Sequence, residues 1–166
     1  NFRNPTNLNN KEEFKIFKEL SPDVVIVVAY GQIIPKNFLS LAKSGFINIH
    51  ASLLPKWRGA APIQRAIMNK DKKIGVSIMK IEDKLDSGPV LATKELVLDQ
   101  NATHGEIEKK LSVMGANLLI ENLKFPKIPD HLILQHFIHK IKGLINESRT
   151  IIGTEFDLEF SHHAGI

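Results

Sequence analysis

Three polar side chains between residues 48 and 86 have the types needed to transfer an acyl group to an amine. Asn48 and His50 are two residues apart in an apolar stretch, and on a β-strand this spacing points both side chains to one face. Asp86 lies in a separate loop and precedes Ser87 and Gly88. Because an amide and an imidazole on an apolar strand are costly without partners, we expect Asp86 to reach His50 and fix its orientation.

The chemistry that suits these groups is the attack of an amine on a carbonyl carbon. Negative charge develops on the carbonyl oxygen, and losing one donor aimed at it typically costs about 3–4 kcal/mol. Asn48 can supply an amide N–H, and His50 a second donor when it is protonated. Asp86 can take the amine proton directly or through a water. From spacing alone, a structural hydrogen-bond cluster at a strand end is the commoner interpretation.

Strands that alternate with helices are expected to position these side chains. The run at residues 23–30 is short, continuous and β-branched, as in a parallel strand covered on both faces. The alternation predicts a three-layer α/β domain with a mainly parallel, Rossmann-like sheet, in which ligands bind beyond the carboxyl ends of the strands. The expected strands are residues 23–30, 46–50, 75–81 and 90–98, and the expected helices are residues 11–20, 35–41, one from 62 and a long one from 103 with a Thr103–Glu106 capping box.

Composition excludes several classes of protein. Among the 166 residues, 43% are hydrophobic and 24% charged, a balance typical of a globular chain. The absence of cysteine excludes a disulfide framework and a thiolate zinc site. No apolar run is long enough to span a bilayer, and the first residues lack both a signal-peptide core and an initiator Met.

Other charged and aromatic residues have two interpretations each. The net charge of +4 favours contact with RNA or an anionic ligand, or only a lysine-rich solvated surface. Trp57 and Arg58 could stack on a base and bind a phosphate, or could shape their loop. We expect no metal, because no carboxylate or cysteine completes a ligand set around the remaining candidates, which are His136, His139, His162 and His163.

Two long motifs resemble the methionyl-tRNA formyltransferase family. Residues 46–66 read FINIHASLLPKWRGAAPIQRA, which is similar to its first signature. Residues 75–88 read GVSIMKIEDKLDSG, which is similar to its second signature, where a Leu-Asp-Ser/Thr-Gly step carries the catalytic Asp. The separation of His50 from Asp86 also matches. The resemblance extends from about Leu8 to about Leu123 and implies a formyltransferase-like α/β catalytic domain.

The resemblance implies a reaction and a role for each matching residue. The donor would be 10-formyltetrahydrofolate, and the acceptor would be the amino group of initiator methionyl-tRNA. Asn48 and His50 would bind and polarise the formyl oxygen, while Asp86 would pair with His50 and manage protons. The residues that match folate-binding segments of the family are Tyr30, Gly31, Gln32, Ile33, Ser52, Leu53, Leu54 and Pro55.

Related branches leave the acceptor open. Phosphoribosylglycinamide formyltransferase and formyltetrahydrofolate dehydrogenase share the Asn, His and Asp, whereas the segment WRGAAPIQ at residues 57–64 favours the tRNA-linked branch. The alternatives are transfer to a small amine, such as phosphoribosylglycinamide or an amino sugar, and an inactive fragment that binds folate. We expect a monomeric protein of the bacterial-type cytoplasm or an organellar matrix, without membrane contact.

The chain departs from the family at both ends. Residues 1–124 would form the C-terminal part of the catalytic domain, and 125–166 a tail of uncertain structure. The family's first sheet units, with a basic loop near the tRNA, and its C-terminal β-barrel have no match. A partial sheet exposes an open edge and an apolar face. We therefore expect the isolated chain to be poorly soluble or inactive, and robust turnover by the purified chain would contradict this.

Overall fold

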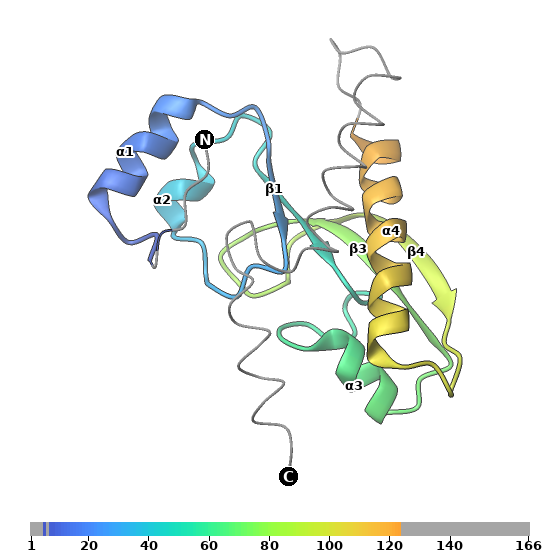
Figure 1. The fold of residues 1–166 in the computed structure, drawn as a ribbon. Coiled ribbons are helices and arrows are strands. Elements are labelled where there is room, and N and C mark those ends of the chain that lie inside the picture. Colours follow the sequence, from blue (N-terminus) through green and yellow to red (C-terminus); the bar gives the residue numbers. More distant parts are fainter. Residues whose placement is uncertain (1–4, 6, 124–166) are drawn as a thin grey trace.

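The computed structural model describes residue 5 and residues 7–123, which form a four-stranded sheet with helices on both faces (Figure 1). The predicted α/β class is therefore confirmed. The predicted tail at residues 125–166 lies outside the described residues. The elements are α1 (Lys11–Leu20), β1 (Val25–Val28), α2 (Lys36–Leu39), β2 (Phe46–His50), α3 (Pro62–Met68), β3 (Lys73–Lys80), β4 (Val90–Val97) and α4 (His104–Asn122).

The sheet is mixed, so the predicted majority of parallel pairings is wrong for the described residues. The strand order is β1-β2-β3-β4, with β1 and β2 parallel and the other two pairs antiparallel. A parallel connection needs a helix that runs back along the whole strand. The connection from β2 to β3 contains only α3, whose seven residues span about 10 Å. The chain therefore enters β3 near the end of the sheet where β2 finished.

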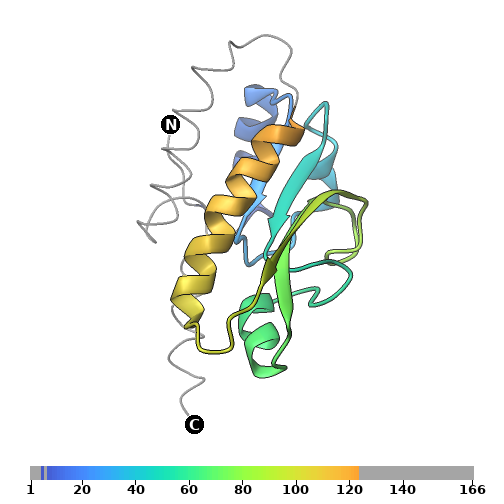
Figure 2. The ribbon, with the colours of Figure 1, turned by 90° about the vertical axis from the view of Figure 1, so that its right-hand side faces the viewer.

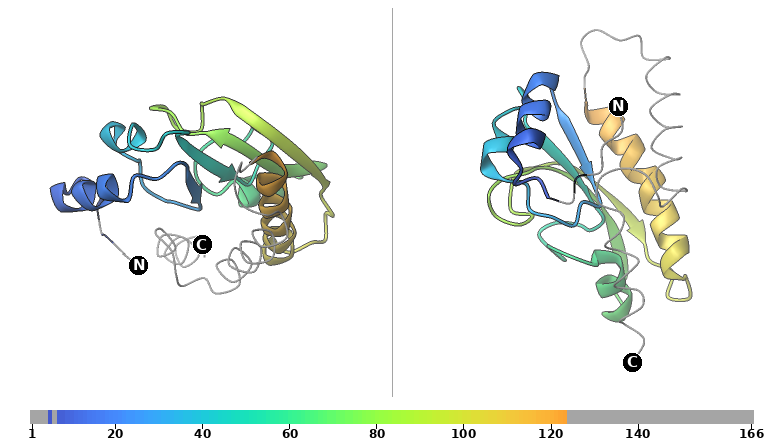
Figure 3. Two further views of the ribbon diagram at one scale, coloured as in Figure 1. Left: turned by 90° about the horizontal axis from the view of Figure 1, so that it is seen from above. Right: turned by 60° about the vertical axis from the view of Figure 1, so that its left-hand side comes forward.

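Two apolar clusters cover the two faces of the sheet. Because strand residues alternate between faces, Val25 and Val27 of β1 pack beneath α1 and α2, whereas Ile26 packs on the side of α4. The ring of Phe38 in α2 meets that of Phe14 in α1 at a centroid distance of 5.3 Å. Figure 3 shows α2 and α4 on opposite sides of the sheet. The domain thus has three layers, as expected.

The long helix α4 begins where the sequence predicts. The side chain of Thr103 accepts a hydrogen bond from the backbone of Glu106, and the Glu106 carboxylate accepts one in return from the Thr103 N–H, which is a complete capping box. The hydrogen bonds from the backbone and then the hydroxyl of Thr103 lower the pKa of Glu106. The helix lies along the sheet and buries Ile107 and Leu119 (Figure 2).

Gly115 allows α4 to lie close to the strand that carries Asn48 and His50. A Cβ atom at Gly115 would lie 2.8 Å from Cγ2 of Ile49, the β2 residue between those two polar side chains. The packing of α4 therefore fixes the position of β2 from the face opposite the polar side chains. Among the helices of the described part, none is long and apolar enough to cross a membrane.

Two glycine substitutions in α4 test this packing. Each substitution replaces glycine by alanine, a better helix former, which by itself raises the free energy of unfolding by up to about 1 kcal/mol. Gly105→Ala should preserve or raise the free energy of unfolding, because its Cβ meets nothing within 4 Å. Gly115→Ala should lower it by about 1–3 kcal/mol, because the methyl group overpacks the helix against Ile49. Urea unfolding of the two variants measures the difference, and equal stabilities would contradict the close approach of α4.

Candidate active site

The strand β2 points Asn48 and His50 to one face of the sheet, as their spacing predicts. Phe46 on that face belongs to the cluster beneath α1 and α2, whereas Ile47 and Ile49 pack on the opposite side. His50 is only 7% exposed. The strand therefore holds the buried imidazole of His50 on the same face as the partly buried amide of Asn48, two residues earlier.

The carboxylate of Asp86 joins both side chains from the loop after β3. Its Oδ2 accepts a hydrogen bond of 2.7 Å from the Gly59 N–H and lies 3.6 Å from Nδ1 of His50. Its Oδ1 accepts a long hydrogen bond of 3.5 Å from Nδ2 of Asn48. Asp86 has a φ of +44°, a strained backbone conformation that its surroundings must stabilise. The structure thus brings Asn48, His50 and Asp86 together around one point.

The backbone of Trp57 determines which ring nitrogen of His50 carries a proton. Nε2 of His50 lies 2.8 Å from the carbonyl oxygen of Trp57. Because a carbonyl oxygen only accepts, Nε2 must be the N–H donor in this contact. In the neutral ring, Nδ1 is then the free base, and it is the nitrogen that faces Asp86. Nδ1 can accept a proton and, once protonated, can donate a hydrogen bond.

This arrangement can serve amine attack on a carbonyl. The amide N–H of Asn48 and a protonated Nδ1 of His50 are donors for the developing oxyanion. Asp86 lies close to both and can accept a proton from an incoming amine or balance the charge of the imidazolium. The described residues thus supply acid, base and oxyanion donor without requiring a side-chain nucleophile.

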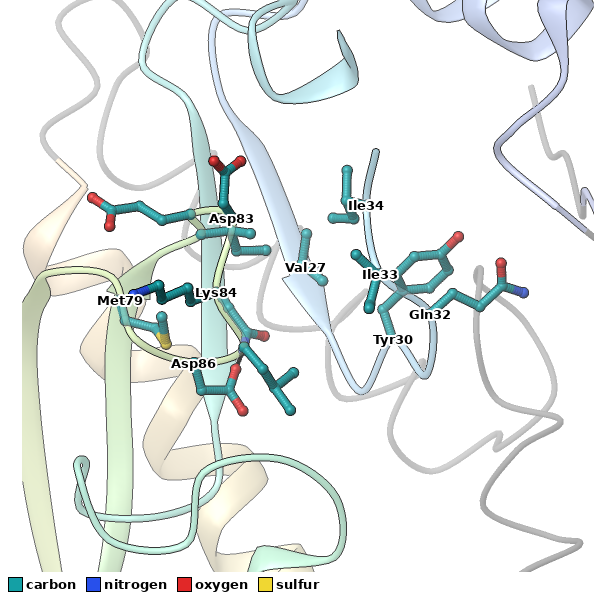
Figure 4. Close-up of a pocket in the computed structure, with 13 residues that line it drawn as sticks. Val27, Tyr30, Gln32, Ile33, Ile34, Met79, Asp83, Lys84 and Asp86 are labelled. Carbon is teal, nitrogen blue, oxygen red and sulfur yellow. Dashed lines mark hydrogen bonds between the residues drawn. The ribbon is translucent and has the colours of Figure 1, made fainter. Parts of the chain in front are cut away.

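Asn48 and Asp86 lie at a pocket between two walls (Figure 4). One wall is the end of β1 with the segment that follows it, and the other is β3 with the loop that carries Asp86. The hydroxyl of Tyr30 is buried and has no hydrogen-bond partner in the described part of the chain, and burial raises the pKa of Tyr30. The lining residues are Val27, Tyr30, Gln32, Ile33, Ile34, Asn48, Met79, Ile81, Glu82, Asp83, Lys84, Leu85 and Asp86.

The predicted folate-binding residues separate into two groups. Tyr30, Gln32 and Ile33 line the pocket, and Gly31 lies between them without lining it. The other group, Ser52, Leu53, Leu54 and Pro55, is absent from the lining and lies in the loop after β2. There the buried Ser52 hydroxyl donates to the Lys56 carbonyl at 2.5 Å. Their contact with folate stays a prediction.

The sequence did not predict several groups that lie at the site. The Gly59 N–H and the Trp57 carbonyl are backbone groups, so no residue type marks them. Met79 and Asn48 are cross-strand neighbours, and the pairing of β2 with β3 would have located Met79 at the pocket. Asp83 also lines the pocket and forms a 2.5 Å ion pair with Lys36 of α2.

No group of three or more potential metal ligands occurs among the residues that the structure describes. The weak candidates His136, His139, His162 and His163 lie outside this part.

Comparisons with known proteins identify relatives of this chain. The methionyl-tRNA formyltransferase of Pelagibacter ubique (strain HTCC1062) is 57% identical over 123 residues, which are 74% of this chain and 40% of that protein. A formyltetrahydrofolate deformylase from Pseudomonas syringae pv. tomato str. DC3000 has a TM-score of 0.63 at 24% identity, over 72% of this chain and 42% of that one. Phosphoribosylglycinamide formyltransferase from Bacillus halodurans has a TM-score of 0.57 at 23% identity, over 87% and 68%.

The two structural likenesses support the fold alone. The chain spans between 37% and 40% of the length of the first curated relatives that it matches. A model of the family described as "Formyl transferase" matches residues 2–123, which include both signature motifs and all three polar side chains. The expected family is therefore confirmed, and the chain belongs to the formyl transferase family.

Proposed function

We propose that the site transfers a formyl group from 10-formyltetrahydrofolate to the amino group of initiator methionyl-tRNA, and so serves translation initiation. The observation that carries the proposal is the convergence of Asn48, His50 and Asp86, of which Asn48 and Asp86 line one pocket. Membership of the formyl transferase family supports the reaction class, and the 57% identity with a methionyl-tRNA formyltransferase supports the acceptor.

The pocket has features that suit the folate donor. The side chains of Ile33 and Leu85 are largely exposed at its two walls and offer apolar surface to a flat ring. Tyr30 lines the wall opposite Asp86, and its buried hydroxyl has no hydrogen-bond partner within the described residues. We propose that the pterin part lies between these walls, with the formyl group directed toward Asn48 and Asp86.

The reaction needs one new bond, one broken bond and the movement of one proton from the amine to the folate nitrogen. The acceptor amine forms a C–N bond to the formyl carbon, and the bond from that carbon to the folate nitrogen breaks. Asn48 and His50, once Nδ1 has taken up a proton from solvent, stabilise the oxyanion between these steps. Asp86 accepts the proton that the amine loses, directly or through a water, and passes it to the folate nitrogen as that nitrogen leaves. No covalent enzyme intermediate is required.

The same proposal includes the oligomeric state of the protein, its location and its acceptor. The protein is proposed to act as a monomer in a bacterial-type cytoplasm or an organellar matrix. The acceptor discriminates this function from formyl transfer to phosphoribosylglycinamide or to an amino sugar. The segment at residues 57–64, which resembles the tRNA-linked branch, lies directly beside the site through the Trp57 and Gly59 backbone contacts.

A single-turnover assay at high protein concentration tests the acceptor. The purified chain is mixed with radiolabelled 10-formyltetrahydrofolate and, separately, with charged initiator tRNA, phosphoribosylglycinamide or an amino sugar. Slow formylation of the methionyl-tRNA alone is expected, because the chain covers only part of its relatives' length.

The matched controls are His50→Ala and His104→Ala, of which only the first changes the proposed site. His104 lies at the start of α4 and is expected to be dispensable. Loss of one oxyanion donor should slow His50→Ala by about 100- to 1,000-fold. Preferred formylation of a small amine would reject the tRNA acceptor, and equal rates for wild type and His50→Ala would reject the site.

A further inference from the structure

A buried carboxylate outside the pocket anchors the loop that contacts His50. Asp71 lies between α3 and β3 and is 7% exposed. Its Oδ1 accepts hydrogen bonds of 2.6 Å from Nζ of Lys56 and of 2.6 Å from Nδ2 of Asn69. Its Oδ2 accepts a hydrogen bond of 2.7 Å from the indole N–H of Trp57. Two adjacent residues of one loop are therefore tied to a single carboxylate.

The carboxylate of Asp71 is suited to act as an anion in this position. Burial acts to raise the pKa of Asp71, but the hydrogen bonds from Lys56, Trp57 and Asn69 and the charge of Lys56 outweigh it, so the pKa is lowered. Hydrogen bonds to an ionised acceptor are stronger than those between neutral groups. The Lys56 ammonium also lies 5.2 Å from the centre of the Trp57 ring. The loop is thus fixed by a charged contact at neutral pH.

The turn that Asp71 fixes provides one backbone contact to His50 and one to Asp86. Trp57 has a φ of +58°, a left-handed conformation that costs energy in a residue with a side chain. Its carbonyl oxygen receives the Nε2–H of His50, and the N–H of Gly59, two residues later, donates to Asp86. A change in the orientation of the Trp57 peptide would therefore disturb His50 and Asp86 together.

The second set of loop contacts lies upstream of this turn. The Ser77 hydroxyl of β3 donates to the Ser52 carbonyl at 2.7 Å and accepts from the Leu54 N–H at 3.0 Å. These contacts fix residues 52–54, and the Ser52 hydroxyl holds the Lys56 carbonyl one residue before Trp57. Asp71 holds the indole of Trp57 itself, the residue whose carbonyl faces His50.

We propose that Asp71 is a positioning residue of the active site, which acts through the Trp57 peptide to hold His50 as its Nε2–H tautomer with Nδ1 directed at Asp86. Asp71 touches neither the pocket nor a reacting atom. Its consequence for formyl transfer rests on the proposed function. Its consequence for the protonation of the His50 ring does not, and this difference separates the two in an experiment.

The tautomer of His50 is measured by long-range 1H–15N NMR of the full chain without substrate, with the His50 signals assigned by their loss in His50→Gln. The wild type should show a protonated Nε2 and a bare Nδ1. Asp71→Asn keeps the shape and removes the charge. In this variant Nε2 loses its fixed acceptor, so the proton should shift toward Nδ1, where Asp86 can accept it.

Two further variants separate positioning from a general loss of structure. Trp57→Phe keeps an aromatic ring without the indole N–H and should reproduce the His50 spectrum of Asp71→Asn. Asn69→Ala removes another donor to the same carboxylate without touching the loop and should leave that spectrum unchanged. Trp57 is the only tryptophan, so its single indole N–H signal reports the broken contact directly and should move upfield in Asp71→Asn.

The outcomes decide the proposal in either direction. A folded Asp71→Asn with the wild-type His50 tautomer would overturn it, and so would a wild type protonated at Nδ1 alone. If Asp71→Asn does not fold, Trp57→Phe gives the same decision. In the transfer assay Asp71→Asn should be slower by about 10- to 100-fold, with little change in the donor concentration that gives half of the maximal rate. Transfer by the wild type to a small amine in place of methionyl-tRNA would reject the proposed function and leave the tautomer result intact.

Discussion

The Asp86 carboxylate connects its own loop with β2 and with the loop that follows β2. It accepts the Gly59 N–H, which anchors the loop after β2, and it lies next to His50 and Asn48 on β2 itself. Its own loop follows β3 and forms one wall of the pocket. The position of this carboxylate therefore fixes both one wall of the pocket and the arrangement of Asn48, His50 and Asp86. Without it, an imidazole and an amide would face each other in a partly buried space with fewer partners.

The mixed sheet explains why these segments meet. Because α3 is too short to carry the chain back along the sheet, β3 runs antiparallel to β2 and ends beside the start of β2. The register pairs Asn48 with Met79, and the chain beyond β3 then turns so that Asp86 reaches the face of Asn48 and His50. On the other side, β1 pairs in parallel with β2 and its end supplies Tyr30 and its neighbours to the opposite wall.

The local patterns in the sequence predicted the parts that depend on residue type. The period of two placed Asn48 and His50 on one face, and the Thr103–Glu106 pair marked the start of α4. The direction of β3 was mispredicted, because alternation of helices and strands does not reveal that α3 is too short to carry the chain back along the sheet. The contacts of Trp57 and Gly59 come from backbone groups that every residue shares. Asp71 could not be told from a surface acid, since its partners Lys56 and Trp57 lie 15 and 14 residues away in the sequence.

A double-mutant cycle on the single-turnover rate tests most directly whether His50 and Asp86 act as one unit. The variants are His50→Ala, Asp86→Asn and the double variant, with the wild type completing the cycle. Groups that share one step are strongly non-additive, so the double variant should be about as slow as the slower single variant. Rate losses that multiply in the double variant would contradict the account, because they would mean that the carboxylate and the imidazole contribute independently.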